Sequence, residues 1–127
     1  MKKAIHSHAA PAVAGPYSQA IEIGEWVFCS GQIGLDPASG KLVEGGVEAQ
    51  AHRALQNLRE VLHAAGLVVD DVIKTTIFLA DMEDFAAVNR IYGAEMVSPY
   101  PARSTVQVAG LPLGARVEIE AIARRHS

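Results

Sequence analysis

Apolar and polar residues alternate along residues 18–33, on both sides of the pair Gly24 and Glu25. Alternation with a period of two is typical of a half-buried strand, and a two-residue turn with glycine first is typical of a type II′ hairpin. The pattern therefore predicts a β-hairpin that joins a strand at Ser18–Ile23 to a strand at Trp26–Ile33.

Helical spacing replaces this alternation in the middle of the chain. Apolar residues recur every three or four positions between Val47 and Ala65, and Gly66 follows as a helix stop. After a β-rich strand at Val72–Leu79, Asp81 can cap a second helix. The apolar stripe of that helix consists of Met82, Phe85, Val88, Tyr92 and Met96. Two more strands are predicted at Ala102–Ala109 and Ala115–Arg124.

The order ββαβαββ predicts an α+β fold, with a mixed β-sheet and two helices packed on one face. The chain has 127 residues, which is one ordinary domain, so we expect a single domain over residues 1–127. Half of the residues are apolar, which favours an oligomer in which sister subunits cover the free face of the sheet.

Charge and composition limit the kinds of partner that this protein can bind. The net charge is −3 and the basic residues are scattered, apart from those in the terminal "ARRHS", so we expect no nucleic-acid partner. The chain has neither a signal-peptide pattern nor an apolar stretch long enough for a bilayer, and we expect a cytoplasmic protein without a membrane partner.

Cofactor and metal signals are weak. His6 and His8 form an H-x-H pair without a third ligand at a suitable spacing, and the sequence contains no glycine-rich phosphate loop. We therefore predict no metal and no cofactor. The single Cys29 lies in an apolar run and is interpreted as a buried small residue.

Charged side chains on the last two predicted strands can share a face. Arg103 and Thr105 lie on one face of their strand, and Glu118 and Glu120 point the same way on the next. If the two strands form a hairpin around residues 110–114, the guanidinium and the carboxylates meet. The pattern alone leaves two interpretations open, a cross-strand ion pair on a solvated face and a binding site.

Two other polar residues stand in unusual places. Asn89 falls on the apolar stripe of the second helix, where a buried amide needs a partner, either a loop or strand edge or a ligand. Tyr17 follows the turn at Gly15 and Pro16, which holds a phenol at a strand entrance for core packing or for a site.

Six segments, which together span nearly the whole chain in order, resemble the RidA/YjgF family of imine deaminases. They are "GPYSQA" (15–20), "CSGQIG" (29–34), "EAQAHRALQNLREVLHAAG" (48–66), "VIKTTIFLADMEDFAAVNRIY" (72–92), "PARSTVQVAGLP" (101–112) and "VEIEAIA" (117–123). The resemblance implies a chorismate-mutase-like α+β fold, assembled as a homotrimer with sites in the clefts between subunits.

The resemblance also implies an activity. This activity is the hydrolysis of reactive enamines and imines, of the 2-aminoacrylate and 2-iminopropanoate type, to a 2-keto acid and ammonia. Removal of these reactive compounds protects pyridoxal-phosphate enzymes. Arg103 matches the family's carboxylate-binding arginine, and a guanidinium binds a carboxylate through two parallel hydrogen bonds. Glu118 aligns with the glutamate that activates water, whereas Glu120 does not fall on that position.

The remaining site residues follow from the same resemblance. Tyr17, Ser30, Gly31 and Asn89 match residues that line the family's cleft. Thr105 stands where many relatives have cysteine, so a role of the backbone carbonyl carries over and a role of the thiol does not.

Three alternatives remain open. The substrate can be a larger imine such as 2-aminomuconate, or the protein can be a non-catalytic metabolite-binding or chaperone-like protein. The third alternative is an endoribonuclease, the activity in the label long attached to the family. The net charge and the absence of an acid/base histidine pair disfavour it.

Overall fold

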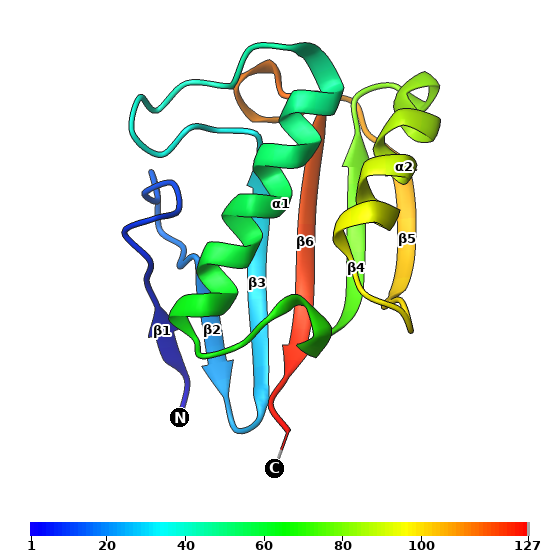
Figure 1. Cartoon of the computed structure of the whole chain (residues 1–127). Coiled ribbons are helices and arrows are strands. Elements are labelled where there is room, and N and C mark those ends of the chain that lie inside the picture. Colours follow the sequence, from blue (N-terminus) through cyan, green and yellow to red (C-terminus); the bar gives the residue numbers. More distant parts are fainter. Residues whose placement is uncertain (127) are drawn as a thin grey trace.

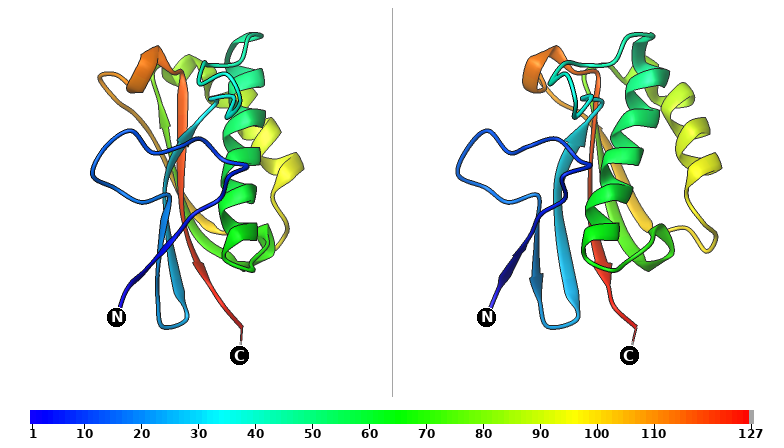
Figure 2. Two further views of the ribbon diagram at one scale, coloured as in Figure 1. Left: turned by 90° about the vertical axis from the view of Figure 1, so that its left-hand side faces the viewer. Right: turned by 60° about the vertical axis from the view of Figure 1, so that its left-hand side comes forward.

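A computed structural model describes residues 1–126 as a single mixed sheet with two helices on one face (Figures 1 and 2). The sheet order is β1-β2-β3-β6-β4-β5, and the predicted α+β class is confirmed. The strands are β1 (Lys3–Ile5), β2 (Ala20–Ile23), β3 (Trp26–Ile33), β4 (Val72–Leu79), β5 (Ala102–Gln107) and β6 (Val117–Arg124); the helices are α1 (Gly46–Ala64) and α2 (Phe85–Glu95), with three short 3-10 turns at Val69–Asp71, Met82–Asp84 and Pro112–Gly114.

The local predictions hold where the signal lies in a few adjacent residues. Ile23 pairs with Trp26, and of the two turn residues between them only Gly24 has a positive φ, at 57°, which is the φ pattern of a type II′ turn. Helix α1 ends in a Schellman motif, in which Gly66 has φ 77° and the Leu67 N–H donates to the Leu62 carbonyl at 2.9 Å.

The core lies between the helices and the sheet. Side chains of α1 such as Leu55, Leu58 and Leu62 are fully buried against the inward residues of the strands, including Ile77 and Ile119. Burying one such side chain stabilises the fold by about 1.5–3 kcal/mol. This packing makes the sheet a rigid support for the side chains at its ends and edges.

The predicted hairpin between the last two strands is wrong. β5 pairs in parallel with β4, and β6 pairs antiparallel with the other side of β4. Both ends of the connection bond to the end of β4, since the Val108 N–H donates to the Leu79 carbonyl (2.9 Å) and the Ala80 N–H to the Arg116 carbonyl (3.1 Å). The β4-α2-β5 crossover places β5 at the sheet edge and overrides the turn signal.

Two smaller differences concern element ends. β1 was not predicted, because a three-residue strand has too few positions to show alternation. The second helix begins at Phe85 instead of directly after Asp81, whose carboxylate accepts a hydrogen bond from the Glu83 N–H at 2.9 Å and caps a 3-10 turn. Met82 lies in that turn and is exposed, so it is not part of the apolar stripe.

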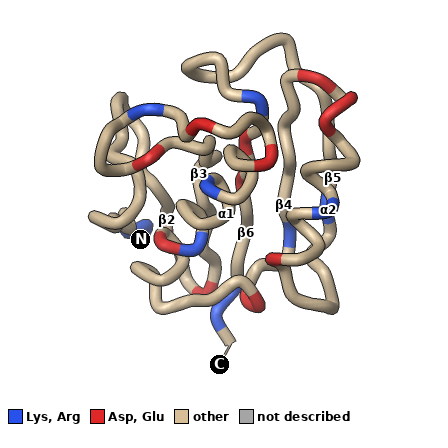
Figure 3. Tube along the Cα trace, turned by 45° about the horizontal axis from the view of Figure 1, so that its top comes forward, with Lys and Arg blue, Asp and Glu red and all other residues tan. Residues whose placement is uncertain are grey.

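The face of the sheet without helices carries exposed apolar side chains. Phe28 on β3 is 45% exposed and Val106 on β5 is 42% exposed. Acidic and basic residues are interspersed along the trace (Figure 3). None of the helices in the described part of the chain has the length and apolar character needed to cross a membrane.

Candidate functional site

The predicted site residues fall on opposite faces of the sheet. Arg103 pairs with Thr75, whose side chain points toward the helices and contacts Tyr92. Glu118 pairs with Phe78, which lies three residues along the same strand and therefore points to the other face. The prediction that Arg103 and the two glutamates share a face within one chain is thus wrong. Their strands lie on either side of β4, and the registers with β4 place Arg103 on one face of the sheet and both glutamates on the other.

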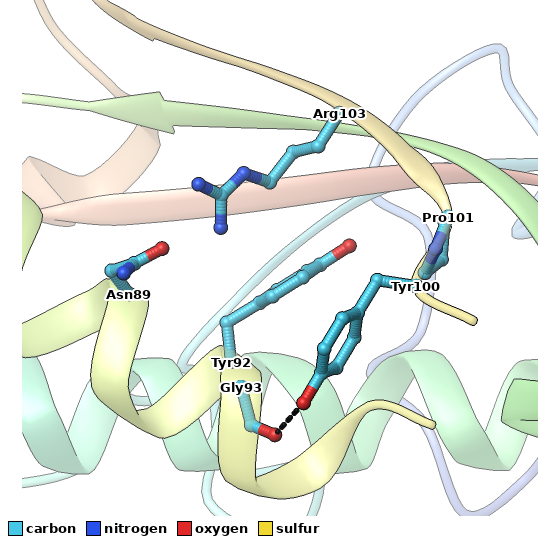
Figure 4. A pocket seen from close by; sticks show the side chains of 6 residues that line it. All are labelled: Asn89, Tyr92, Gly93, Tyr100, Pro101 and Arg103. Atoms are coloured by element: carbon cyan, nitrogen blue, oxygen red, sulfur yellow. Dashed lines mark hydrogen bonds between the residues drawn. The ribbon is translucent and has the colours of Figure 1, made fainter. Parts of the chain in front are cut away.

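The first group, Asn89, Arg103 and Thr105, is called here the arginine half-site. It lies between α2 and β5, beside a pocket of about 420 Å³ lined by Asn89, Tyr92, Gly93, Tyr100, Pro101 and Arg103 (Figure 4). The guanidinium lies over the Tyr92 ring, with 5.0 Å from Cζ to the ring centroid, and near the Phe85 ring at 5.7 Å. No carboxylate among residues 1–126 pairs with Arg103, so its N–H groups are free to donate hydrogen bonds to the carboxylate of a ligand.

Two polar groups accompany this arginine. The Thr105 hydroxyl is buried and has no hydrogen-bond partner in the described structure, and Thr105 lies beside Arg103 and Asn89. A buried unpaired hydroxyl is unfavourable by about 1–3 kcal/mol. Asn89 is exposed at the rim, so the expectation of a buried amide is wrong, and a contact between Asn89 and a ligand stays a prediction.

The second group, Tyr17, Ser30, Gly31 and Glu118, is called here the glutamate half-site. Tyr17, Gly31 and Glu118 line a cleft of about 410 Å³ between the loop before β2 and strands β3 and β6. Gly31 lies where the β3–β6 register shifts, and a Cβ atom at this residue would lie 2.6 Å from Oε2 of Glu118. Glycine is therefore needed for the close approach of the carboxylate to β3.

Ser30 and Gln19 hold the segment that carries Tyr17. The Ser30 hydroxyl donates to the Ser18 carbonyl at 2.6 Å, and the Ser30 backbone N–H donates to the Gln19 carbonyl at 3.0 Å. The buried Gln19 amide donates to the carbonyls of Ser7 (3.1 Å) and Pro11 (2.9 Å) and accepts from the Ser7 N–H (2.6 Å). Gln19 was not predicted as a supporting residue, although a glutamine among apolar strand positions was a visible signal.

The electrostatics distinguish Glu118 from the other carboxylates. Burial, and then the negative charge of Glu120, raise the pKa of the Glu118 carboxyl above its ordinary value. A carboxyl with a raised pKa exchanges protons closer to neutral pH, which suits a general base and acid. Burial also raises the pKa of the Cys29 thiol to about 12, which makes it unreactive and agrees with the predicted buried cysteine.

Comparison with known proteins identifies the family. A family profile described as "Endoribonuclease L-PSP" matches residues 7–125. The chain belongs to this family, which is the RidA/YjgF family. Among its relatives, a mouse 2-iminobutanoate/2-iminopropanoate deaminase is 54% identical over 97% of this chain and 91% of its own. The deaminase of the same name from Salmonella typhimurium is 48% identical over 98% and 99%.

Solved structures of RidA/YjgF relatives agree with the fold. RidA from the Antarctic bacterium Psychrobacter superimposes with a TM-score of 0.93 at 44% identity, covering 97% of this chain and 99% of its own. Escherichia coli TdcF with bound serine gives a TM-score of 0.91 at 43% identity, covering 98% and 99%. The resemblance stated from the sequence is confirmed.

A metal site has no support in the side-chain arrangement. Within residues 1–126, no three His, Cys, Asp or Glu side chains lie close enough together to hold an ion. A reaction without metal or cofactor stays a prediction.

Proposed function

We propose that this protein hydrolyses reactive 2-imino acids of the 2-iminobutanoate and 2-iminopropanoate type to 2-keto acids and ammonia. Family membership and the names of relatives at 54% and 48% identity support this activity. The observation that carries the proposal is Arg103, a guanidinium stacked on Tyr92 with no carboxylate partner in the described structure. Such a group suits a small ligand with a carboxylate beside the reacting carbon.

The complete site, in our proposal, forms between two protomers of a homotrimer. Arg103 and Glu118 lie on opposite faces of one sheet, so the arginine half-site of one protomer needs the glutamate half-site of a neighbour. β5 is an edge strand and can present Arg103 to another chain. The exposed Phe28 and Val106 supply apolar surface for the contact.

The chemistry then follows from the two half-sites. Arg103 binds the substrate carboxylate and thereby fixes the imine carbon next to Glu118 of the neighbour. The Glu118 carboxylate takes a proton from water as the water oxygen bonds to that carbon and passes it to the imine nitrogen, which gives a tetrahedral carbinolamine. Glu118 then takes the proton of the carbinol hydroxyl and delivers it to the nitrogen. The C–N bond breaks as the C=O bond forms, and ammonia and the keto acid leave with Glu118 ionised again.

The other site residues have supporting roles. Tyr17, Ser30 and Gly31 form the wall on the glutamate side, and Asn89 forms the rim on the arginine side. The backbone carbonyl of Thr105 helps to hold the water. The reaction needs neither metal nor cofactor, and it takes place in the cytoplasm without a nucleic-acid or membrane partner.

The test is ammonia release from 2-aminoacrylate generated in situ, with wild type, Arg103→Ala and Glu118→Gln measured side by side. We expect acceleration above the spontaneous rate that both variants lose. If wild-type protein leaves this spontaneous rate unchanged but hydrolyses larger imino acids such as 2-aminomuconate, the substrates belong to that larger class. No acceleration with any imine would contradict the proposed activity.

A further inference from the structure

Tyr92 on α2 lies directly behind Arg103 and is only 3% exposed. The guanidinium carbon of Arg103 lies 5.0 Å from the Tyr92 ring centroid, and the ring lies between this arginine and the wall formed by Gly93 and Tyr100 (Figure 4). A cation within about 6 Å of an aromatic face is attracted by the ring quadrupole. Tyr92 therefore supports one face of the guanidinium.

The far end of the same ring is fixed as well. The Tyr92 hydroxyl and the Thr75 hydroxyl form a hydrogen bond of 2.7 Å, and Thr75 is 1% exposed. Thr75 is also the register partner of Arg103 on the adjacent strand. Strand β4, the Tyr92 ring and the Arg103 side chain thus form a closed set of contacts. Burial raises the pKa of Tyr92, so its phenol stays neutral at physiological pH.

We infer that Tyr92 is a positioning residue, which holds the Arg103 guanidinium in its carboxylate-binding orientation before substrate arrives. The inference rests on the proposed function. An unsupported arginine loses much rotamer freedom when it binds a ligand, and support in advance removes that loss from the binding step. Within residues 1–126 this support comes from aromatic faces alone, which leaves the N–H edges of the guanidinium free for the carboxylate.

Two substitutions separate support by the ring from the hydrogen bond to Thr75. Tyr92→Phe keeps the aromatic face, and we expect its KM and kcat to stay within about twofold of wild type. Tyr92→Leu keeps apolar bulk and loses the face, and we expect KM for 2-iminopropanoate to rise about fivefold to tenfold with kcat nearly unchanged. The matched control is Ile91→Ala, which removes buried packing from the same helix and should leave KM unchanged.

A measurement that needs no turnover is the ¹⁵N relaxation of the Arg103 Nε–H group, assigned with Arg103→Lys. We expect an ordered Nε–H with upfield-shifted side-chain protons in wild type and Tyr92→Phe, and loss of order in Tyr92→Leu. A mobile Arg103 in the wild-type protein overturns the inference, even if Tyr92→Leu does not fold. Wild-type KM in folded Tyr92→Leu overturns it too. An ordered Arg103 that depends on Tyr92, in a protein without deaminase activity, contradicts only the proposed function.

Discussion

Gly31→Ala is the substitution that tests the geometry of the glutamate half-site most sharply. A Cβ atom at residue 31 would lie 2.6 Å from Oε2, 2.7 Å from Cδ and 2.8 Å from Cγ of Glu118. Ordinary contact begins at 3.4 Å, so the carboxylate must move from 2.6 Å to at least that distance, a displacement of about 0.8 Å. Misplacing a catalytic group by about 1 Å can lower the rate about 100-fold.

Folding should suffer much less than catalysis. The three atoms that the new methyl group meets belong to a flexible, half-buried side chain, which can rotate away from β3. We therefore expect the free energy of unfolding in urea to fall by no more than about 1 kcal/mol. The expected loss of kcat toward 2-iminopropanoate is about 100-fold.

The matched control is Gly110→Ala. Gly110 lies near Glu118 in another pocket of the same face, has no positive φ, and an added Cβ meets nothing within 4 Å. Its kcat should stay within about twofold of wild type. Gly31→Ala protein that folds and keeps wild-type kcat would refute the assignment of Glu118 as the water-activating group.

Three further predictions concern the charged side chains. Arg103→Lys should lose at least about tenfold in kcat/KM although the charge remains, because an ammonium group cannot bind a carboxylate in bidentate fashion; wild-type kcat/KM in steady-state assays would remove that argument. Glu120→Gln removes one of the two causes that raise the pKa of Glu118, so the acid limb of the pH profile of kcat/KM should move to lower pH, and an unmoved limb would show that Glu120 does not act on the base. The raised pKa of Glu118 means that ionisation of this carboxyl destabilises the folded state. The stability that the protonated carboxyl contributes is present below its ordinary pKa and is lost as the pH rises through its pKa in the folded protein. Glu118→Gln should therefore raise Tm at pH 7 but not at pH 4, and equal effects at both pH values would contradict this.

The sequence predicted those elements whose signals are local. The hairpin at Gly24 and the end of α1 at Gly66 each depend on a few adjacent residues, and both are present. The pairing of β5 was missed because strand partners are chosen by tertiary packing, here by the α2 crossover that brings β5 beside β4. Period-two alternation placed Arg103 and Glu118 correctly within their own strands but could not show which faces those strands turn to the helices.

The site was predicted in a similarly uneven way. Resemblance to the RidA/YjgF family supplied Arg103 and Glu118, whose roles stay proposals, whereas Gln19 and Tyr92 escaped notice as supporting residues. Gln19 bonds to Ser7, twelve residues away, and Tyr92 to Thr75, seventeen residues away. Contacts at such separations depend on the folded sheet, so no short motif reveals them.

Subunit complementation tests the composite site most directly. Arg103→Ala and Glu118→Gln chains are each expected to be inactive, and they are co-expressed so that mixed oligomers form. Random assortment at a shared interface places an intact Arg103 opposite an intact Glu118 in about one quarter of the sites, so deaminase activity of about that fraction of wild type should return. Mixed oligomers without activity, despite active wild-type protein prepared in the same way, would contradict a site built from two protomers.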